Sequence, residues 1–132
     1  MNPALRQFVS ERADRRCEYC RLPDLAPQLI RFHCEHIRPR RHGGTDEPAN
    51  LAWACARCNE RKGTHLAAED PDTGELTRLF NPRLDRWEDY FTLKGVHIVG
   101  QSALGRSTVW LLELNHERRL ELRAMIRELG MF

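Results

Sequence analysis

The apolar residues of this chain follow two different periods in its first forty positions. From Pro3 to Arg15 they recur at near-helical spacing, which predicts a first helix. Residues 22–28 contain two prolines and are expected to form a turn-rich connector. Residues 29–37 then have the composition of a short strand, which Pro39 closes.

A second short apolar stretch is suited to pair with this strand. Residues 40–50 carry Gly43-Gly44 and Pro48, and therefore predict an exposed loop. Residues 51–54 predict a second strand, antiparallel to the first, and residues 56–64 predict a helix. The order strand, loop, strand, helix is that of a ββα unit.

The second half of the chain predicts further short elements. The cluster at residues 70–74 indicates a turn, after which residues 75–80 could form a strand. Lys94-Gly95 separates two apolar stretches, so residues 87–93 and 96–99 are expected to pair as a hairpin.

Two helices are expected near the end of the chain, the first over residues 108–114. Asn115 is suited to cap the second, and Gly130 to end it. Its apolar face would consist of Leu122, Ile126 and Leu129. All three tryptophans of the chain are expected to pack against other residues.

Length and charge narrow the class of protein. A chain of 132 residues is long enough for one compact domain. It has no run of about 18 apolar residues and no apolar stretch typical of a secretory signal, so we expect a cytoplasmic protein without membrane association. The net charge of +2 hides an asymmetry, since residues 1–65 hold twelve Arg and Lys against eight Asp and Glu. This arginine-rich half is compatible with a polyanionic partner.

Four of the five cysteines form two C-x-x-C pairs, Cys17/Cys20 and Cys55/Cys58, while Cys34 stands apart. Two such pairs can supply four thiolates to a tetrahedral Zn²⁺. Four ordinary buried cysteines or a redox C-x-x-C are the alternatives, but redox motifs are usually single and lie on βαβ patterns. We expect a structural zinc site, because four thiolates leave no position for substrate or water.

Candidate catalytic residues occur before and after the second cysteine pair. Hydrolysis of a phosphodiester needs a base for water and a cation for the leaving oxygen. Glu35-His36 places a hard oxygen ligand beside a group that can be neutral near pH 7. Asn59 carries an amide oxygen that could reach the same cation.

Basic residues surround these candidates and could contact phosphates. A solvated charged surface is the alternative explanation for the run at residues 38–41. The candidate phosphate contacts are Arg38, Arg40, Arg41, Arg57, Arg61 and Lys62.

Several spaced motifs resemble the HNH (His-Asn-His) endonuclease family, in the subclass with two C-x-x-C zinc knuckles. The resemblance covers residues 17–65 and implies an α+β fold. Its ββα-metal (HNH, treble-clef-like) core would carry an N-terminal helix, a four-cysteine zinc site and a C-terminal β-hairpin plus helices. Residues 1–68 would form the nuclease core and residues 69–132 an extension packed on the same domain. The motifs are Glu35-His36-Ile37-x-Pro39, Gly43-Gly44, Asn50-Leu51, Cys55-x-x-Cys58-Asn59 and Lys62-Gly63.

The resemblance also implies roles for individual residues. His36 would be the general base that deprotonates water. Glu35 and Asn59 would hold a catalytic Mg²⁺ or Mn²⁺. Asn50 would hold the loop through backbone hydrogen bonds and so orient His36. The implied reaction is hydrolysis of a DNA strand to a 5′-phosphate and a 3′-hydroxyl.

Two positions depart from the usual family pattern. Asn59 is a neutral amide where many members have histidine, which favours a hard ion. Glu35 is one methylene longer than the usual aspartate. In addition, strict strand alternation puts Glu35 and His36 on opposite faces, so both can serve one site only if the strand twists or ends there.

Two other functions are compatible with the same cysteine framework. One is a zinc-knuckle module that binds nucleic acid without cutting it, and the other is a structural zinc domain used for protein contacts. His36 favours the enzyme, since a binding module has no need of a base at that position.

Overall fold

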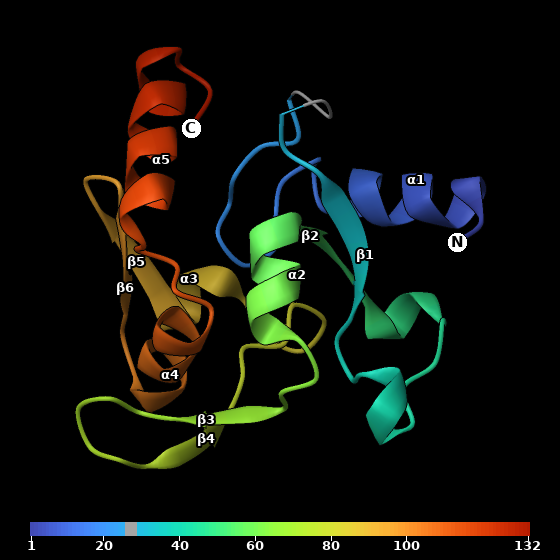
Figure 1. The fold of residues 1–132 in the computed structure, drawn as a ribbon, viewed down its shortest axis with the longest axis horizontal. Helices are drawn as coiled ribbons and strands as arrows, with labels where there is room; N and C mark the ends of the chain where they lie inside the picture. The colour runs from blue at the N-terminus through green and yellow to red at the C-terminus, as the bar shows by residue number, and fades with distance from the viewer. Residues whose placement is uncertain (26–28) are drawn as a thin grey trace. The chain divides into compact units, whose positions relative to one another are not determined.

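The computed structural model describes residues 1–25 and 29–132, which divide into two compact units, Met1–Thr64 and His65–Phe132. Each unit combines helices with two-stranded antiparallel sheets (Figure 1). The α+β class expected from the sequence is therefore confirmed. The last three residues of the connector expected over 22–28 lie outside the described residues.

The first unit begins with helix α1 (Pro3–Arg12). The Asn2 side chain accepts a hydrogen bond of 2.7 Å from a backbone N–H of the first turn, and Pro3 occupies the first helical position. Both features favour the start of a helix. The helix ends before the predicted Arg15, because Asp14 and Arg15 both have a left-handed φ of 56°.

The ββα unit predicted from the sequence is present. Strand β1 (Phe32–His36) pairs antiparallel with β2 (Leu51–Cys55), and helix α2 (Ala56–Lys62) follows directly. His36 lies opposite Leu51, so the pairing runs to the last residue of β1. The first strand is shorter than the predicted 29–37.

Strand β2 is buried along its whole length and contacts both α1 and α2. Because two helices pack against it, it does not alternate between buried and exposed positions. Trp53 in its centre stacks on Phe32 with 5.6 Å between ring centroids. The expected packing of Trp53 is therefore confirmed.

The second unit contains two hairpins. Strands β3 (Ala67–Glu69) and β4 (Leu76–Arg78) pair antiparallel, and Gly74 with a φ of 77° lies in their connection. The turn expected at residues 70–74 is present, and the second strand is shorter than the predicted 75–80.

The second hairpin turns at Gly95-Val96, one residue later than the predicted Lys94-Gly95. Strands β5 (Phe91–Lys94) and β6 (His97–Gly100) form it. The prediction that its first strand begins at residue 87 is wrong, because Trp87–Tyr90 form a helical turn, α3. Aromatic packing explains this turn, since Trp87 and Phe91 approach to 5.2 Å between ring centroids.

Helix α4 (Ala103–Leu111) begins and ends earlier than the predicted 108–114. Ser102 caps it by accepting a backbone N–H at 3.3 Å, a cap that the sequence prediction missed. Asn115 does not cap helix α5 (Glu117–Glu128); His116 does. The Asn115 amide instead exchanges two hydrogen bonds, of 2.7 and 2.8 Å, with the backbone of Ile98.

The buried face of α5 differs from the predicted apolar face. Ile126 is buried, but Leu129 is 67% exposed, while Arg119 and Arg123 are buried. Arg123 donates to the Val96 carbonyl at 2.8 Å and to the Asn115 side-chain oxygen at 3.0 Å, so its buried guanidinium has polar partners. Among the residues that the structure describes, none of the helices combines the length and apolar character needed to cross a bilayer.

The expectation that all three tryptophans pack against other residues fits Trp110 on α4 least, because its side chain is 57% exposed. The aromatic core of the second unit is built from other residues. Phe80 meets Phe91 edge-on, with 5.2 Å between ring centroids.

A buried carboxylate, Asp70, organises the β3–β4 connection. Arg106 on α4 donates to both of its oxygens, at 3.0 and 2.8 Å, and Thr73 donates at 2.8 Å. The Arg106 guanidinium holds the pKa of Asp70 far below its usual range. Asp70 therefore stays ionised and links α4 to the hairpin.

The depressed pKa of Asp70 predicts an acid-sensitive second unit. Stabilisation by the carboxylate is present above its unfolded pKa of about 3.9 and is lost as the pH falls below that value. We expect Asp70→Asn to lower the Tm at pH 7, and its difference from wild type to shrink at pH 3. Circular-dichroism melts measure both, with the exposed Glu69→Gln as control. A difference of equal size at both pH values would contradict the role of the charge.

Candidate functional site

Four buried cysteine side chains converge in the first unit. The sulfur atoms of Cys17, Cys20, Cys55 and Cys58 all lie within 4.8 Å of one another. The Cys20 and Cys55 sulfurs are 3.7 Å apart, close to the edge of about 3.8 Å of a tetrahedron with Zn–S bonds of about 2.3 Å. The donors therefore fit a tetrahedral metal ion, and the metal-binding arrangement expected from the two C-x-x-C motifs is confirmed.

Both knuckles have the same local geometry. In each, the backbone N–H of the second cysteine points at the sulfur of the first, at 3.5 Å for Cys20 to Cys17 and for Cys58 to Cys55. Burial raises the pKa of the Cys17 and Cys58 thiols. A bound cation is therefore needed to hold such thiols as thiolates.

Glu35 points into the interior of the first unit. Its side chain is 3% exposed, and it accepts hydrogen bonds from the Tyr19 hydroxyl and, at 3.1 Å, from the Lys62 ammonium. Burial raises the pKa of Glu35, while the charge of Lys62 and the hydrogen bond from Tyr19 oppose that shift. Both carboxylate oxygens thus already have protein donors.

Lys62 supplies a cation inside the protein. Its side chain is 2% exposed, and Nζ also donates to the carbonyls of His36 and Ile37, at 3.2 and 2.8 Å. Three acceptors satisfy an ammonium with three N–H donors. The expectation that Lys62 contacts DNA phosphates is at odds with this burial, and the lysine instead joins α2 to the end of β1.

Glu35, Tyr19 and Lys62 form an interior cluster. His36 faces away from it. It is 22% exposed, and Nε2 lies 2.7 Å from a carboxylate oxygen of Asp46. Arg40 donates to both oxygens of the same carboxylate, at 2.7 and 2.8 Å. Hydrogen bonds from His36 and Arg40 lower the pKa of Asp46, so this group is a carboxylate and the imidazole Nε2 donates to it.

Asn50 fixes the loop between His36 and β2. Its amide accepts from the Arg38 N–H at 2.9 Å and donates to the carbonyls of Arg38 and Thr45, at 3.1 and 2.8 Å. The backbone hydrogen bonds predicted for Asn50 are therefore present. Gly44 allows this close approach, since a Cβ there would meet the Arg38 carbonyl.

Asn59 lies on α2 and is half-buried. Its side-chain amide makes no hydrogen bond to any residue that the structure describes. It remains available as an oxygen ligand, in contrast to Glu35.

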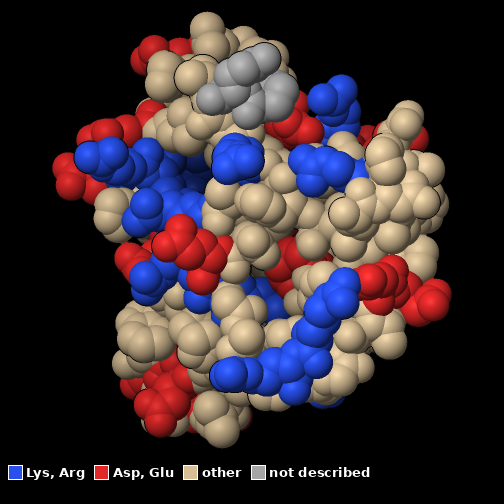
Figure 2. Space-filling model, turned by 45° about the vertical axis from the view of Figure 1, so that its right-hand side comes forward, with Lys and Arg blue, Asp and Glu red and all other residues tan. Residues whose placement is uncertain are grey.

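The other expected phosphate contacts differ in exposure. Arg57 is half-buried, and its Nε has no hydrogen-bond partner among the described residues. On the face drawn in Figure 2, basic side chains lie in separate groups with acidic ones beside them. The exposed residues of the predicted set are Arg38, Arg40, Arg41 and Arg61.

Sequence reasoning missed two residues that hold the site. Asp46 lies in the Gly-rich loop, where an acidic residue is ordinary; its position ten residues after His36 carried no signal by itself. Tyr19 lies between the first two cysteines, and only the folded knuckle brings its hydroxyl to Glu35.

Comparison with known proteins agrees with this geometry. A family model described as HNH endonuclease matches residues 17–65. The Septu protein PtuB of Bacillus thuringiensis is 27% identical over 125 residues, covering 89% of this chain. The chain spans 44% of the length of that relative. No solved structure matches the chain.

The matched segment contains the features that the family resemblance required. It begins at the first knuckle and ends just after α2, so it includes the cysteine cluster, the antiparallel strand pair and His36. The match therefore identifies residues 17–65 as an HNH endonuclease domain.

Proposed function

We propose that this chain is an HNH endonuclease that hydrolyses DNA phosphodiester bonds, with His36 as the general base. The observation that carries the proposal is the His36–Asp46 pair at the end of β1, beside the Asn50 loop. The match of residues 17–65 to a nuclease family supports it.

The His36–Asp46 contact suggests which nitrogen acts as the base. Because an ionised Asp46 accepts the Nε2 proton, a neutral His36 carries its lone pair on Nδ1. Nδ1 makes no hydrogen bond to any residue in the described part of the chain. It is therefore suited to take a proton from a water that attacks phosphorus, while Asp46 keeps the ring oriented and stabilises the imidazolium.

A catalytic Mg²⁺ or Mn²⁺ belongs to the proposal as an expectation. Such an ion stabilises charge on the scissile phosphate and the leaving oxygen. The Asn59 amide fits the role of ligand, but Glu35 does not fit as it lies, since Lys62 and Tyr19 occupy its oxygens. Glu35 would bind the metal ion only after its hydrogen bond from Lys62 is broken.

The cysteine cluster is proposed to hold a structural Zn²⁺. Four thiolates in tetrahedral arrangement leave no position for substrate, so its role would be to join the first knuckle to β2 and α2. Exposed arginines near His36 suit a DNA backbone as partner.

A non-catalytic nucleic-acid-binding module is the second candidate. The Lys62–Glu35 pair favours it, because a buried ammonium already neutralises the expected metal ligand. Cleavage and binding assays on matched variants separate the two candidates.

Removing the proposed base tests the enzymatic function. His36→Ala should lower the rate of plasmid cleavage by roughly 10²–10⁴-fold in the presence of Mg²⁺ or Mn²⁺, since that is the usual contribution of a general base. DNA affinity should stay nearly unchanged. His97→Ala, an exposed histidine of the second unit, is the control. Binding without cleavage by wild type under all metal conditions would support the binding module instead.

Asp46 offers a separate test of how His36 is positioned. Asp46→Asn replaces the acceptor carboxylate and permits the wrong tautomer of the imidazole. Cleavage should slow by at least roughly tenfold and by no more than about 10⁴-fold. Single-turnover cleavage rates measure the effect, with Glu47→Gln as the neighbouring control. Unaltered rates would remove Asp46 from the mechanism.

Metal analysis tests the zinc proposal. Purified wild type and Cys34→Ser should each contain one zinc per chain, whereas Cys58→Ser should lose it. Because structural zinc contributes roughly 10 kcal/mol or more of binding free energy, the first unit of Cys58→Ser should be unfolded at 25 °C. Mass spectrometry of metals and the dispersion of NMR amide signals report the two outcomes. A folded, metal-free Cys58→Ser would refute the structural role.

A further inference from the structure

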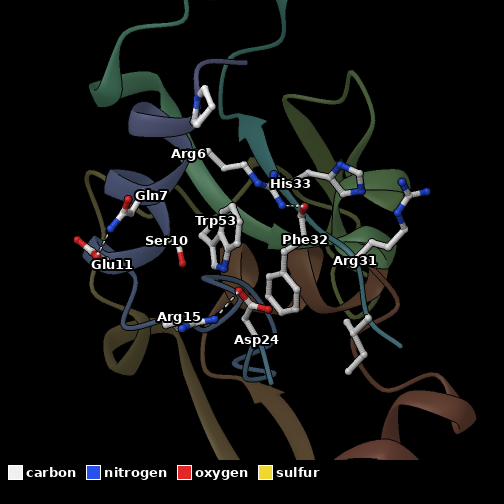
Figure 3. A pocket seen from close by; sticks show the side chains of 12 residues that line it. Arg6, Gln7, Ser10, Glu11, Arg15, Asp24, Arg31, Phe32, His33 and Trp53 are labelled. Carbon is white, nitrogen blue, oxygen red and sulfur yellow. Dashed lines mark hydrogen bonds and ion pairs between the residues drawn. The ribbon is translucent and has the colours of Figure 1, made fainter. Parts of the chain in front are cut away.

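A second candidate site lies in the first unit, on a pocket of about 720 Å³. Residues of α1 and residues 30–33 at the start of β1 line it, together with Trp53 of β2 (Figure 3). Its lining, within the described part of the chain, includes neither His36 nor Asp46 nor Asn59. The volume falls in the range of roughly 300–1,000 Å³ that is typical of small-molecule sites.

One side of this pocket is strongly basic. Arg6, Arg31 and His33 gather there in Figure 3. Burial lowers the pKa of His33, and the positive charges of Arg6 and Arg31 lower it further. A pocket wall that carries two guanidinium groups suits an anionic ligand group.

These two guanidinium groups are not neutralised by the pocket's own acids. Of the carboxylates in the lining, Asp24 lies 3.7 Å from Arg15, and Glu11 accepts a hydrogen bond from Gln7. Among the residues that the structure describes, no carboxylate pairs with Arg6 or Arg31. Their charge is therefore available to a ligand.

Arg6 is already held in place. Its guanidinium lies over the Trp53 ring, 4.7 Å from the ring centroid, and donates to the Phe32 carbonyl at 2.9 Å. A fixed guanidinium loses little further freedom when it binds an anion.

The Trp53 indole provides an independent indication of a ligand. Trp53 is 3% exposed, and its Nε1 is buried without a hydrogen-bond partner among the described residues. Buried N–H groups are normally paired. In Figure 3 the nitrogen edge of the indole is directed toward the side of the pocket where Asp24 lies. A ligand oxygen, directly or through a water, would satisfy it.

We propose that this pocket binds a phosphate ester of mononucleotide size, with the phosphate held by Arg6 and Arg31. Guanidinium groups bind phosphate oxygens through paired N–H donors, and two of them match a doubly charged phosphate. The pocket's volume accommodates the rest of such a ligand. This site is separate from the proposed nuclease centre and does not depend on it.

Isothermal titration calorimetry tests the proposal on the full chain carrying His36→Ala, so that DNA is not cut. The probes are inorganic phosphate, a deoxynucleoside 5′-monophosphate, and a short single-stranded oligonucleotide without terminal phosphates. The monophosphate should bind more tightly than inorganic phosphate. Arg31→Ala should weaken its binding by roughly tenfold or more, the usual effect of losing a charged hydrogen bond, and Arg31→Lys should weaken it less.

The control is Arg118→Ala, an exposed arginine on α5. Arg31 is exposed and its side chain makes no hydrogen bond to the described residues, so its variants should fold, and a melting curve checks this. Absent monophosphate binding, or binding that Arg31→Ala leaves unchanged, would overturn the proposal. It would also fail if only the oligonucleotide bound in an Arg31-dependent manner, since the arginines would then be a strand contact. Plasmid cleavage by wild type reports separately on the nuclease.

Discussion

The first unit depends on the convergence of four sulfur atoms. Cys20 and Cys55 are 35 residues apart in sequence, yet their sulfurs lie 3.7 Å from each other. A unit of this size has a small apolar core, for which a metal cross-link is a common supplement. The cluster brings the first knuckle against the end of β2, and this in turn places Tyr19 beside Glu35. Contacts of the interior cluster thus follow from the sulfur geometry.

The end of β1 separates two environments. Glu35 points into a buried cluster with Lys62, whereas the adjacent His36 points to an exposed carboxylate, Asp46. This is the alternation expected of a strand, and it puts the two neighbouring side chains in different environments. Lys62 binds the carbonyls at the strand end from inside, while Asn50 binds the loop backbone from outside. These hydrogen bonds fix the backbone of His36 and of the loop after it, and Asp46 orients the ring.

The sequence predicted those parts of the molecule that are specified by a short-range residue pattern or by a family motif. The two C-x-x-C pairs, the ββα order and the Asn50 hydrogen bonds were accessible because each rests on short-range pattern or on family motif. It could not predict that Lys62 is buried, since a lysine near the end of a helix is usually solvated. Nor could it predict the partner of Asn115, which forms hydrogen bonds with Ile98 of β6 instead of capping α5. Such pairings arise from tertiary contacts that periodicity does not encode.

The loop that carries the His36–Asp46 pair is held by hydrogen bonds among its own residues and by contacts with Arg12, Lys62 and Thr64 outside it. The side-chain hydrogen bonds of Asn50 and Asp46 span at most 12 positions, in contrast to the sulfur cluster. The side-chain contacts that orient the imidazole are therefore local, whereas the backbone of residues 36–50 is anchored to α1 and α2. A transplanted copy of this loop would keep the His36–Asp46 pair, but its new host would have to supply groups equivalent to Arg12 and Lys62.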